Sequence, residues 1–230
     1  MKTKINYFAI LTFYTIAIAL RYLTNKTDFL SGVSNEFLKV LLQGVGPAVG
    51  AVVAFSVFKI KLVLSLKGNY KKAIFPFLLY WGLPIALILG VEFFTKGAIS
   101  SFATVIAILM YGLLEEIGWR GFLQQELKTL PVFLNVLIVG TLWFIWHLNF
   151  DLTSSNLIFF GILLLGSWGI GKVADNTYSL FAVAAFHSLN NFFPEMNTTK
   201  IVILVALLAI WIVSLVIRKR QLHRENPLIQ

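Results

Sequence analysis

Two adjacent carboxylates, Glu115 and Glu116, follow the uncharged run TVIAILMYGLL at residues 104–114. A charge at the centre of a membrane-spanning helix costs about 2.5–3.5 kcal/mol on insertion scales, so such a group faces a bundle interior or a wet cavity. Arg120 follows Glu116 by four residues and is expected to pair with it on one helical face. Glu115 points about 100° away and needs another partner. A purely structural ion pair at the end of a helix is the alternative interpretation.

Two histidines lie in other apolar segments of the chain. His147 ends the run GTLWFIWH, where Trp143 lies four residues earlier and is expected to brace its ring. His187 precedes Asn191 by four residues, which places both on one helical face. A single histidine of this kind is more often a hydrogen-bonded packing residue. Two of them beside a glutamate without a cation, in a chain with 13% charged residues, indicate a hydrolytic site. His223 lies in a basic tail and is expected to be solvated.

These side chains support two versions of hydrolysis. A carboxylate takes a proton from water, a neutral imidazole holds that water, and an amide with a second imidazole stabilises an oxyanion. Glu115, His147 and His187 would also be an adequate ligand set for one divalent metal ion such as zinc, with an open position for water. The HExxH pattern of soluble zinc proteases is absent from the sequence. The metal-free and the zinc-dependent version both stay open.

The composition is that of a membrane protein. The chain has 230 residues, of which 58% are hydrophobic and 13% charged, whereas soluble domains carry about 25% charged residues. It has 21 phenylalanines and no cysteine, which excludes disulfides and thiolate metal sites. The net charge of +9 could indicate nucleic-acid binding. Because the basic residues lie between apolar runs, we interpret the charge as membrane topology and expect no nucleic-acid partner.

Apolar runs of about 20 residues, the length that crosses a bilayer, predict an all-α polytopic protein with about eight transmembrane helices in one bundle. The predicted spans are residues 5–23, 36–58, 73–94, 99–119, 131–149, 156–171, 178–193 and 199–217. The sixth is short and interrupted by Gly161, Gly166 and Gly169. The first follows MKTK as a signal peptide would, but no small-residue cleavage site follows it, so it is expected to be a retained span.

The basic residues predict the orientation of the chain. With eight spans, fourteen of the 19 lysines and arginines fall on the side of both termini and five on the other, which predicts cytoplasmic termini in a multi-pass cell-membrane protein. Strict alternation then separates Glu115, near the cytoplasmic end of its span, from His147, near the opposite end of the next. The helices must therefore be offset, or the amphipathic segment GFLQQELKTLP, residues 121–131, must lie in the interface.

Three motifs resemble those of the CPBP family of intramembrane endopeptidases, also called Abi or CaaX-protease-like proteins. The family pattern EExxxR corresponds to residues 115–120, FxxxH to residues 143–147, and HxxxN to residues 187–191. The departure is Trp143, where the commonest form has phenylalanine. The resemblance predicts N-terminal transmembrane helices over residues 1–98, a catalytic core over 99–195, and a last helix with a basic cytoplasmic tail over 196–230.

The resemblance also implies roles for the motif residues. Glu115 would activate the water, Glu116 would support it and pair with Arg120, and His147 would help to hold the water. His187 and Asn191 would stabilise the tetrahedral intermediate. The substrate would be a membrane-associated protein or peptide in the lipid bilayer, and it would be lipidated if it resembles the prenylated CaaX proteins that some members cleave. The resemblance leaves metal dependence open.

Two other functions remain open at this point. A non-catalytic bacteriocin-immunity or scaffold protein could recognise a peptide in the same fold. A transporter could use the buried glutamates and histidines as a proton relay, but the inverted repeats typical of transporters are not apparent in the sequence.

Overall fold

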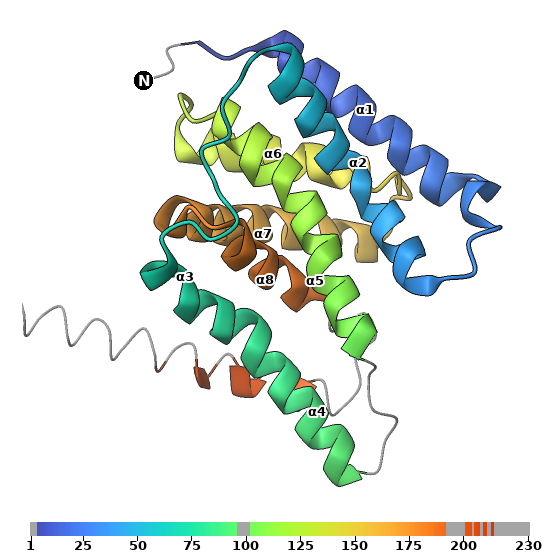
Figure 1. The fold of residues 1–230 in the computed structure, drawn as a ribbon, viewed down its shortest axis with the longest axis vertical. Helices are drawn as coiled ribbons and strands as arrows, with labels where there is room; N and C mark the ends of the chain where they lie inside the picture. The colour runs from blue at the N-terminus through green and yellow to red at the C-terminus, as the bar shows by residue number, and fades with distance from the viewer. Residues whose placement is uncertain are drawn as a thin grey trace, which may run out of the picture.

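The computed structural model describes residues 4–95 and 102–191 and, within the segment 201–213, residues 201–203, 205–207, 209, 210 and 213. The described part is an all-helical bundle without a named β-strand, as predicted (Figure 1). Its elements are α1 (Tyr7–Lys26), η1 (Asp28–Leu30), α2 (Glu36–Val57), α3 (Tyr70–Phe77), η2 (Leu78–Gly82), α4 (Leu83–Thr95), α5 (Phe102–Glu116), η3 (Ile117–Gln124), α6 (Val132–Trp146), α7 (Ser154–Thr177) and α8 (Leu180–Asn191). The predicted last span, 199–217, is described in part, and His223 with the basic tail lies outside the described residues.

Polar caps fix where several apolar helices begin. The side chains of Asn6, Asn35 and Asn69 accept hydrogen bonds from backbone N–H groups in the first turns of α1, α2 and α3. Thr153 does the same for α7. Asparagine and threonine are favoured at this position because their side chains satisfy N–H groups that lack a partner within the helix. The helix starts are therefore encoded locally, even where hydrophobicity is uniform.

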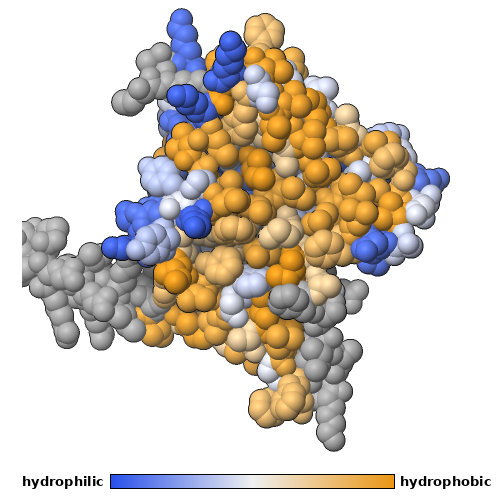
Figure 2. All heavy atoms as spheres, viewed as in Figure 1, coloured by the Kyte–Doolittle hydropathy of each residue, from blue (hydrophilic) through white to orange (hydrophobic). Residues whose placement is uncertain are grey.

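The outer surface is that of a membrane protein. Four helical stretches are long and apolar enough to cross a bilayer, namely Tyr7–Lys26, Glu36–Val57, Tyr70–Gly90 and Ser154–Thr177, whereas α6 and α8 are apolar but shorter. Large apolar side chains such as Phe8, Phe75 and Leu165 are exposed. The face in Figure 2 is broadly hydrophobic, with hydrophilic side chains towards its margins. Monomeric soluble proteins rarely expose apolar patches larger than a few hundred Å², so lipid is the natural neighbour of this surface. The count of eight spans and the orientation of the termini stay predictions.

The helix α7 differs from its predicted form. It is continuous over 24 residues, so its glycines do not interrupt it. One of them is instead a packing site, because a Cβ built at Gly169 would lie 2.9 Å from the ring of Phe186 on α8. On the other side, a Cβ built at Gly140 of α6 would lie 2.7 Å from Leu164 of α7. Small residues let helices approach closely in a membrane, and here they seat α7 against both neighbours.

The helix with the two glutamates also extends beyond its predicted end. The α-helix α5 passes directly into the π-helix η3, and the helical backbone continues to residue 126. Phe122 and Leu123, at the start of the segment 121–131, are fully buried in the bundle, and an interfacial location of this segment stays a prediction. This continuation places Glu115 and Glu116 near the middle of a helix rather than at its end. The expected separation of Glu115 from His147 is thereby removed.

The pair α1–α2 packs tightly beside this long helix. Two glycines of α2 with GxxxG spacing meet the backbone of α1, because a Cβ at Gly46 would lie 2.8 Å from the carbonyl oxygen of Ala17 and one at Gly50 would lie 2.5 Å from that of Phe13. Towards η3, a Cβ at Gly118 would lie 2.5 Å from Cβ of Pro47. These contacts fix α1 and α2 against the segment that carries the glutamates.

The connection 58–69 between α2 and α3 fastens the other side of the bundle. It runs along the α7–α8 turn, where Ser65 N–H donates to the carbonyl oxygen of Tyr178 at 3.0 Å and Leu180 N–H donates to that of Ser65 at 2.9 Å. Gly68 has φ +55°, and a Cβ there would lie 2.4 Å from the carbonyl oxygen of Thr177. A residue with a side chain is therefore strained at this position. The connection 58–69 fixes the start of α8, the helix that carries His187.

Candidate active site

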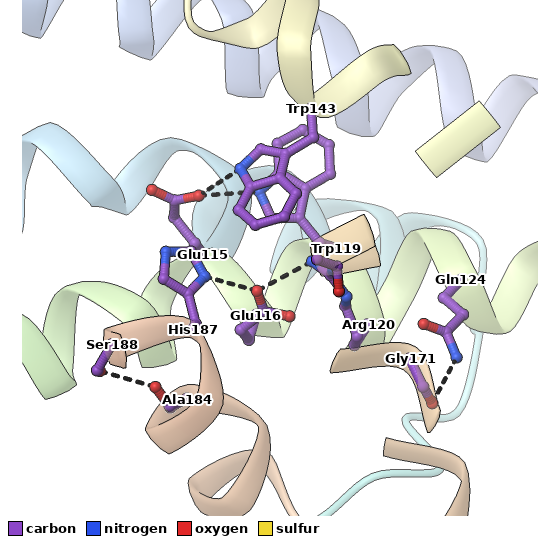
Figure 3. Close-up of polar contacts among 11 residues, drawn as sticks. Glu115, Glu116, Trp119, Arg120, Gln124, Trp143, Gly171, Ala184, His187 and Ser188 are labelled. Atoms are coloured by element: carbon purple, nitrogen blue, oxygen red, sulfur yellow. Dashed lines mark hydrogen bonds and ion pairs between the residues drawn. The ribbon is translucent and has the colours of Figure 1, made fainter. Parts of the chain in front are cut away.

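The two carboxylates lie in the centre of the bundle on the α5–η3 helix. The relative exposure is 1% for Glu115 and 0% for Glu116. Their side chains diverge, and each meets a donor four residues further on, Trp119 for the first and Arg120 for the second (Figure 3). A π-helical turn follows immediately, and such turns occur frequently at functional sites. The adjacent glutamates therefore have separate surroundings.

Glu116 is held by two cationic or potentially cationic groups. Its Oε1 accepts a hydrogen bond from Nη1 of Arg120 at 2.9 Å, which confirms the predicted pairing. The same oxygen lies 2.7 Å from Nδ1 of His187 on α8. The guanidinium also lies 4.7 Å from the ring centroid of Trp143. The side chains of Arg120 and Glu116 are both fully buried.

Glu115 has neutral donors in place of a salt bridge. Its Oε2 accepts hydrogen bonds from the indole N–H of Trp143 at 2.8 Å and from that of Trp119 at 3.2 Å. Trp143 lies beside the ring of His147 as expected, with ring centroids 6.3 Å apart, and its indole N–H is directed to the Glu115 carboxylate. Trp119 was not predicted as a site residue, although its position four residues after Glu115 was a usable signal. The two indoles fix the orientation of the Glu115 carboxylate.

His147 lies at the C-terminal cap of α6, one residue beyond the helix. Its Nδ1 lies 2.8 Å from the carbonyl oxygen of Trp143. Because a carbonyl oxygen only accepts, Nδ1 carries the proton, and in the neutral ring Nε2 is an acceptor. The ring packs edge-to-face on Phe159 and Trp146, at centroid distances of 4.8 and 5.2 Å. Glu115 lies within electrostatic reach of this ring and of His187, so the structure brings the three groups together.

His187 and Asn191 lie one turn apart on α8. His187 is buried, and its ring centroid lies 5.2 Å from that of Trp143. Asn191 is the last residue of the described helix, and its Nδ2 is buried without a hydrogen-bond partner among the described residues. A buried amide donor without a partner is costly in a folded protein and therefore requires an explanation. Asn191 is thus a donor that a bound group can satisfy.

Two further residues at the site were not predicted. Tyr111 lies four residues before Glu115 on α5, and its side chain is close to both Glu115 and Arg21. Arg21 comes from α1, far away in the sequence. The spacing to Glu115 could have indicated Tyr111, whereas Arg21 is brought to the site by tertiary packing alone.

A comparison with protein families bears on the same part of the chain. Residues 97–193 match the model of the family described as Rce1-like type II CAAX prenyl endopeptidase. This segment is Rce1-like. The match confirms the family resemblance that the three motifs predicted. No match was found among curated proteins.

The Rce1-like segment contains every residue that was predicted for the site, namely Glu115, Glu116, Arg120, Trp143, His147, His187 and Asn191. Arg21 lies outside it. The chain therefore combines a segment that is similar to this family with further apolar helices, one of which carries Arg21 near the same site.

The predicted ligand set for a metal ion was Glu115, His147 and His187. Among the described residues, no group of three histidine, aspartate or glutamate side chains is placed to hold one ion. Oε2 of Glu115 already accepts two indole N–H bonds, and Nδ1 of each histidine contacts a protein oxygen. These bonds leave Nε2 of both histidines open and do not exclude a metal ion. Because no three such ligands are gathered among the described residues, no step below depends on one. Metal dependence stays a question for experiment.

Proposed function

We propose that this protein is an intramembrane endopeptidase that hydrolyses a peptide bond in a membrane-associated protein or peptide. The observation that carries the proposal is the pair of buried carboxylates with separate partners, beside two histidines from other helices. Buried ionisable residues in a membrane bundle are expensive and mark functional sites. A structural ion pair accounts for Glu116 and Arg120, but it leaves Glu115, its two indole donors and His147 unexplained.

In this proposal Glu115 is the general base. The two indole bonds hold Oε2, so that the carboxylate keeps one orientation and Oε1 can accept a proton from the attacking water. His147 is oriented by its Nδ1–H bond to the backbone, and its Nε2 accepts the second O–H of that water. The water is thereby placed between a base and an acceptor, and its oxygen attacks the carbonyl carbon of the scissile peptide bond.

The oxyanion that forms is stabilised from α8. The unpartnered Nδ2 of Asn191 donates to it. Glu116 at 2.7 Å orients the ring of His187 and stabilises its charged form, in which Nε2–H is a second donor. Arg120 balances the charge of Glu116, so Arg120, Glu116 and His187 form a bonded chain across η3 and α8. Collapse of the intermediate then releases the amine, which takes a proton from Glu115.

We infer that the substrate is a prenylated C-terminal peptide of the CAAX type. The description of the matching family supports this class. The exposed apolar side chains of α1, α3 and α7 also place the bundle in lipid, where a prenyl group resides. A substrate anchored in the bilayer reaches the buried site laterally, without the cost of leaving the membrane.

The test is mass spectrometry of a peptide panel incubated with purified protein in liposomes. Farnesylated and geranylgeranylated CAAX peptides are compared with the same peptides without the lipid. We expect cleavage of a lipidated peptide, its loss in His147→Ala and His187→Ala, and wild-type cleavage in His223→Ala. Asn191→Ala should lose about 10²–10³ in rate, the effect of one oxyanion donor. Panel peptides that stay intact with folded protein would refute the proposed substrate class.

Chelation is the second arm of this test. Because the described side chains do not form a metal-ligand set, we expect thorough chelation to leave the rate unchanged. Loss of activity on chelation with recovery on zinc addition would contradict the metal-free mechanism and restore the zinc-dependent version.

A further inference from the structure

Arg21 is a partly buried cation, and no carboxylate is bonded to it among the described residues. It lies in the apolar run TIAIALRYL of α1. Its Nη1 donates to the carbonyl oxygen of Gln43 at 3.2 Å, and its Cζ lies 4.3 Å from the ring centroid of Trp146. Its Nε is buried and has no hydrogen-bond partner in the described part of the chain. An arginine placed in an apolar helix at this cost requires a reason beyond packing.

Glu115 is a carboxylate within electrostatic reach of Arg21. Tyr111 lies close to both groups, and Glu115, Tyr111 and His147 all lie within electrostatic reach of the guanidinium. Glu116 already has Arg120 at 2.9 Å, whereas the direct donors to Glu115 are neutral indoles. Two adjacent carboxylates thus have two arginines near them. Arg120 is bonded to Glu116, and Arg21 lies within electrostatic reach of Glu115.

The position of Arg21 is fixed by contacts that do not involve its own side chain. The indole N–H of Trp146 donates to the carbonyl oxygen of Ala17, one turn before Arg21, at 3.0 Å. The hydroxyl of Tyr14 donates to the carbonyl oxygen of Leu142 on α6 at 2.8 Å. Together with the glycine contacts to α2, these bonds dock α1 on α6 beside His147. A guanidinium is therefore held near the site even though α1 lies outside the Rce1-like segment.

We propose that Arg21 is a positioning residue that supplies the positive charge for Glu115, so that α1 completes the catalytic centre. Through this charge and the intervening Tyr111, Arg21 keeps the Glu115 carboxylate oriented towards the substrate. The inference rests on the proposed function for its catalytic consequence. Its electrostatic part, the coupling between Arg21 and Glu115, stands without any peptidase activity.

The coupling is tested by thermal unfolding in detergent of Arg21→Gln, Glu115→Gln and the double variant. Arg21→Gln should lower the melting temperature, because Glu115 loses its cation. In the Glu115→Gln background, Arg21 is a charge without a counter-charge. Arg21→Gln should therefore lower the melting temperature there by less than half as much as in the wild type. Lys26→Gln, at the exposed end of α1, is the control and should melt as wild type in both backgrounds. Equal losses in the two backgrounds would overturn the coupling and leave Arg21 as a packing residue.

The catalytic part is tested by steady-state kinetics on the cleaved peptide. Arg21→Gln should lower kcat by about 10–100-fold, which is less than the effect of removing a direct oxyanion donor. KM should change by less than about threefold. Arg21→Lys keeps the charge but not the planar fork and should recover at least half of the lost kcat on a logarithmic scale. A rise in KM at unchanged kcat, or no recovery in Arg21→Lys, would overturn the positioning role. If no panel peptide is cleaved, the proposed function fails, while the unfolding cycle still decides the coupling.

Discussion

Replacement of Arg120 by alanine should destabilise the protein strongly. Both members of the pair with Glu116 have fully buried side chains, and Nη1 lies 2.9 Å from Oε1. Removing one partner of a buried pair costs about 3–5 kcal/mol, because the other charge stays buried without compensation. His187 remains 2.7 Å from the same oxygen and offsets part of this loss, so we expect about 3 kcal/mol. For a chain of this size that corresponds to a fall in melting temperature of roughly 6–12 °C.

The assay is unfolding in detergent followed by tryptophan fluorescence, since Trp119, Trp143 and Trp146 are buried at the site. Arg120→Lys should recover part of the loss, because a point charge cannot replace the guanidinium fork. The control is Lys39→Ala, which removes an exposed pair with Glu36 at 3.7 Å and should cost less than about 0.5 kcal/mol. If Arg120→Ala melts like that control, the buried pair does not stabilise the fold as argued.

Three further outcomes follow from the same structure. Trp143→Phe removes the shorter indole bond to the base, 2.8 Å, and should lower stability by about 1.5–3 kcal/mol in the same unfolding assay; wild-type melting would contradict that bond. Gly118→Ala places a Cβ 2.5 Å from a proline of α2 and should lower stability by about 1–3 kcal/mol. Its control, Gly161→Ala, meets nothing within 4 Å and should melt at or above the wild-type temperature. Equal melting temperatures of the two variants would refute the close approach of α2 to η3. Because fourteen of 19 basic residues fall on one side, a reporter after residue 230 should be cytoplasmic and one inserted at residues 95–97 should be outside; a cytoplasmic signal at 95–97 would contradict eight spans.

Much of the fold could be predicted from hydrophobicity alone. The predicted spans 36–58 and 131–149 differ by a few residues from α2, Glu36–Val57, and α6, Val132–Trp146. The largest differences lie where a helix continues through residues that normally end one. Polar residues after Glu116 suggested an end, but their partners on other helices bury them, and the glycines of α7 suggested a break but pack against neighbouring side chains.

In the candidate site, contacts within one helix could likewise be predicted, whereas contacts between helices could not. The pairing of Glu116 with Arg120 is an i,i+4 contact within one helix and was predicted correctly. The indole bond from Trp119 to Glu115 has the same spacing and could have been predicted by the same rule. The donation from Trp143 to Glu115 and the approach of Arg21 depend on how α6 and α1 dock onto α5, which no local spacing encodes.

Cleavage by Glu115→Gln is the most direct test of Glu115 as the catalytic base. Glutamine keeps an oxygen that accepts the two indole bonds but cannot take a proton from water. We therefore expect a folded protein, with a melting temperature lowered only by the loss of the counter-charge of Arg21, and no detectable product from the peptide that the wild type cleaves. Product formed at the wild-type rate by folded Glu115→Gln would contradict the assignment of Glu115 as the base and favour a binding role for the site.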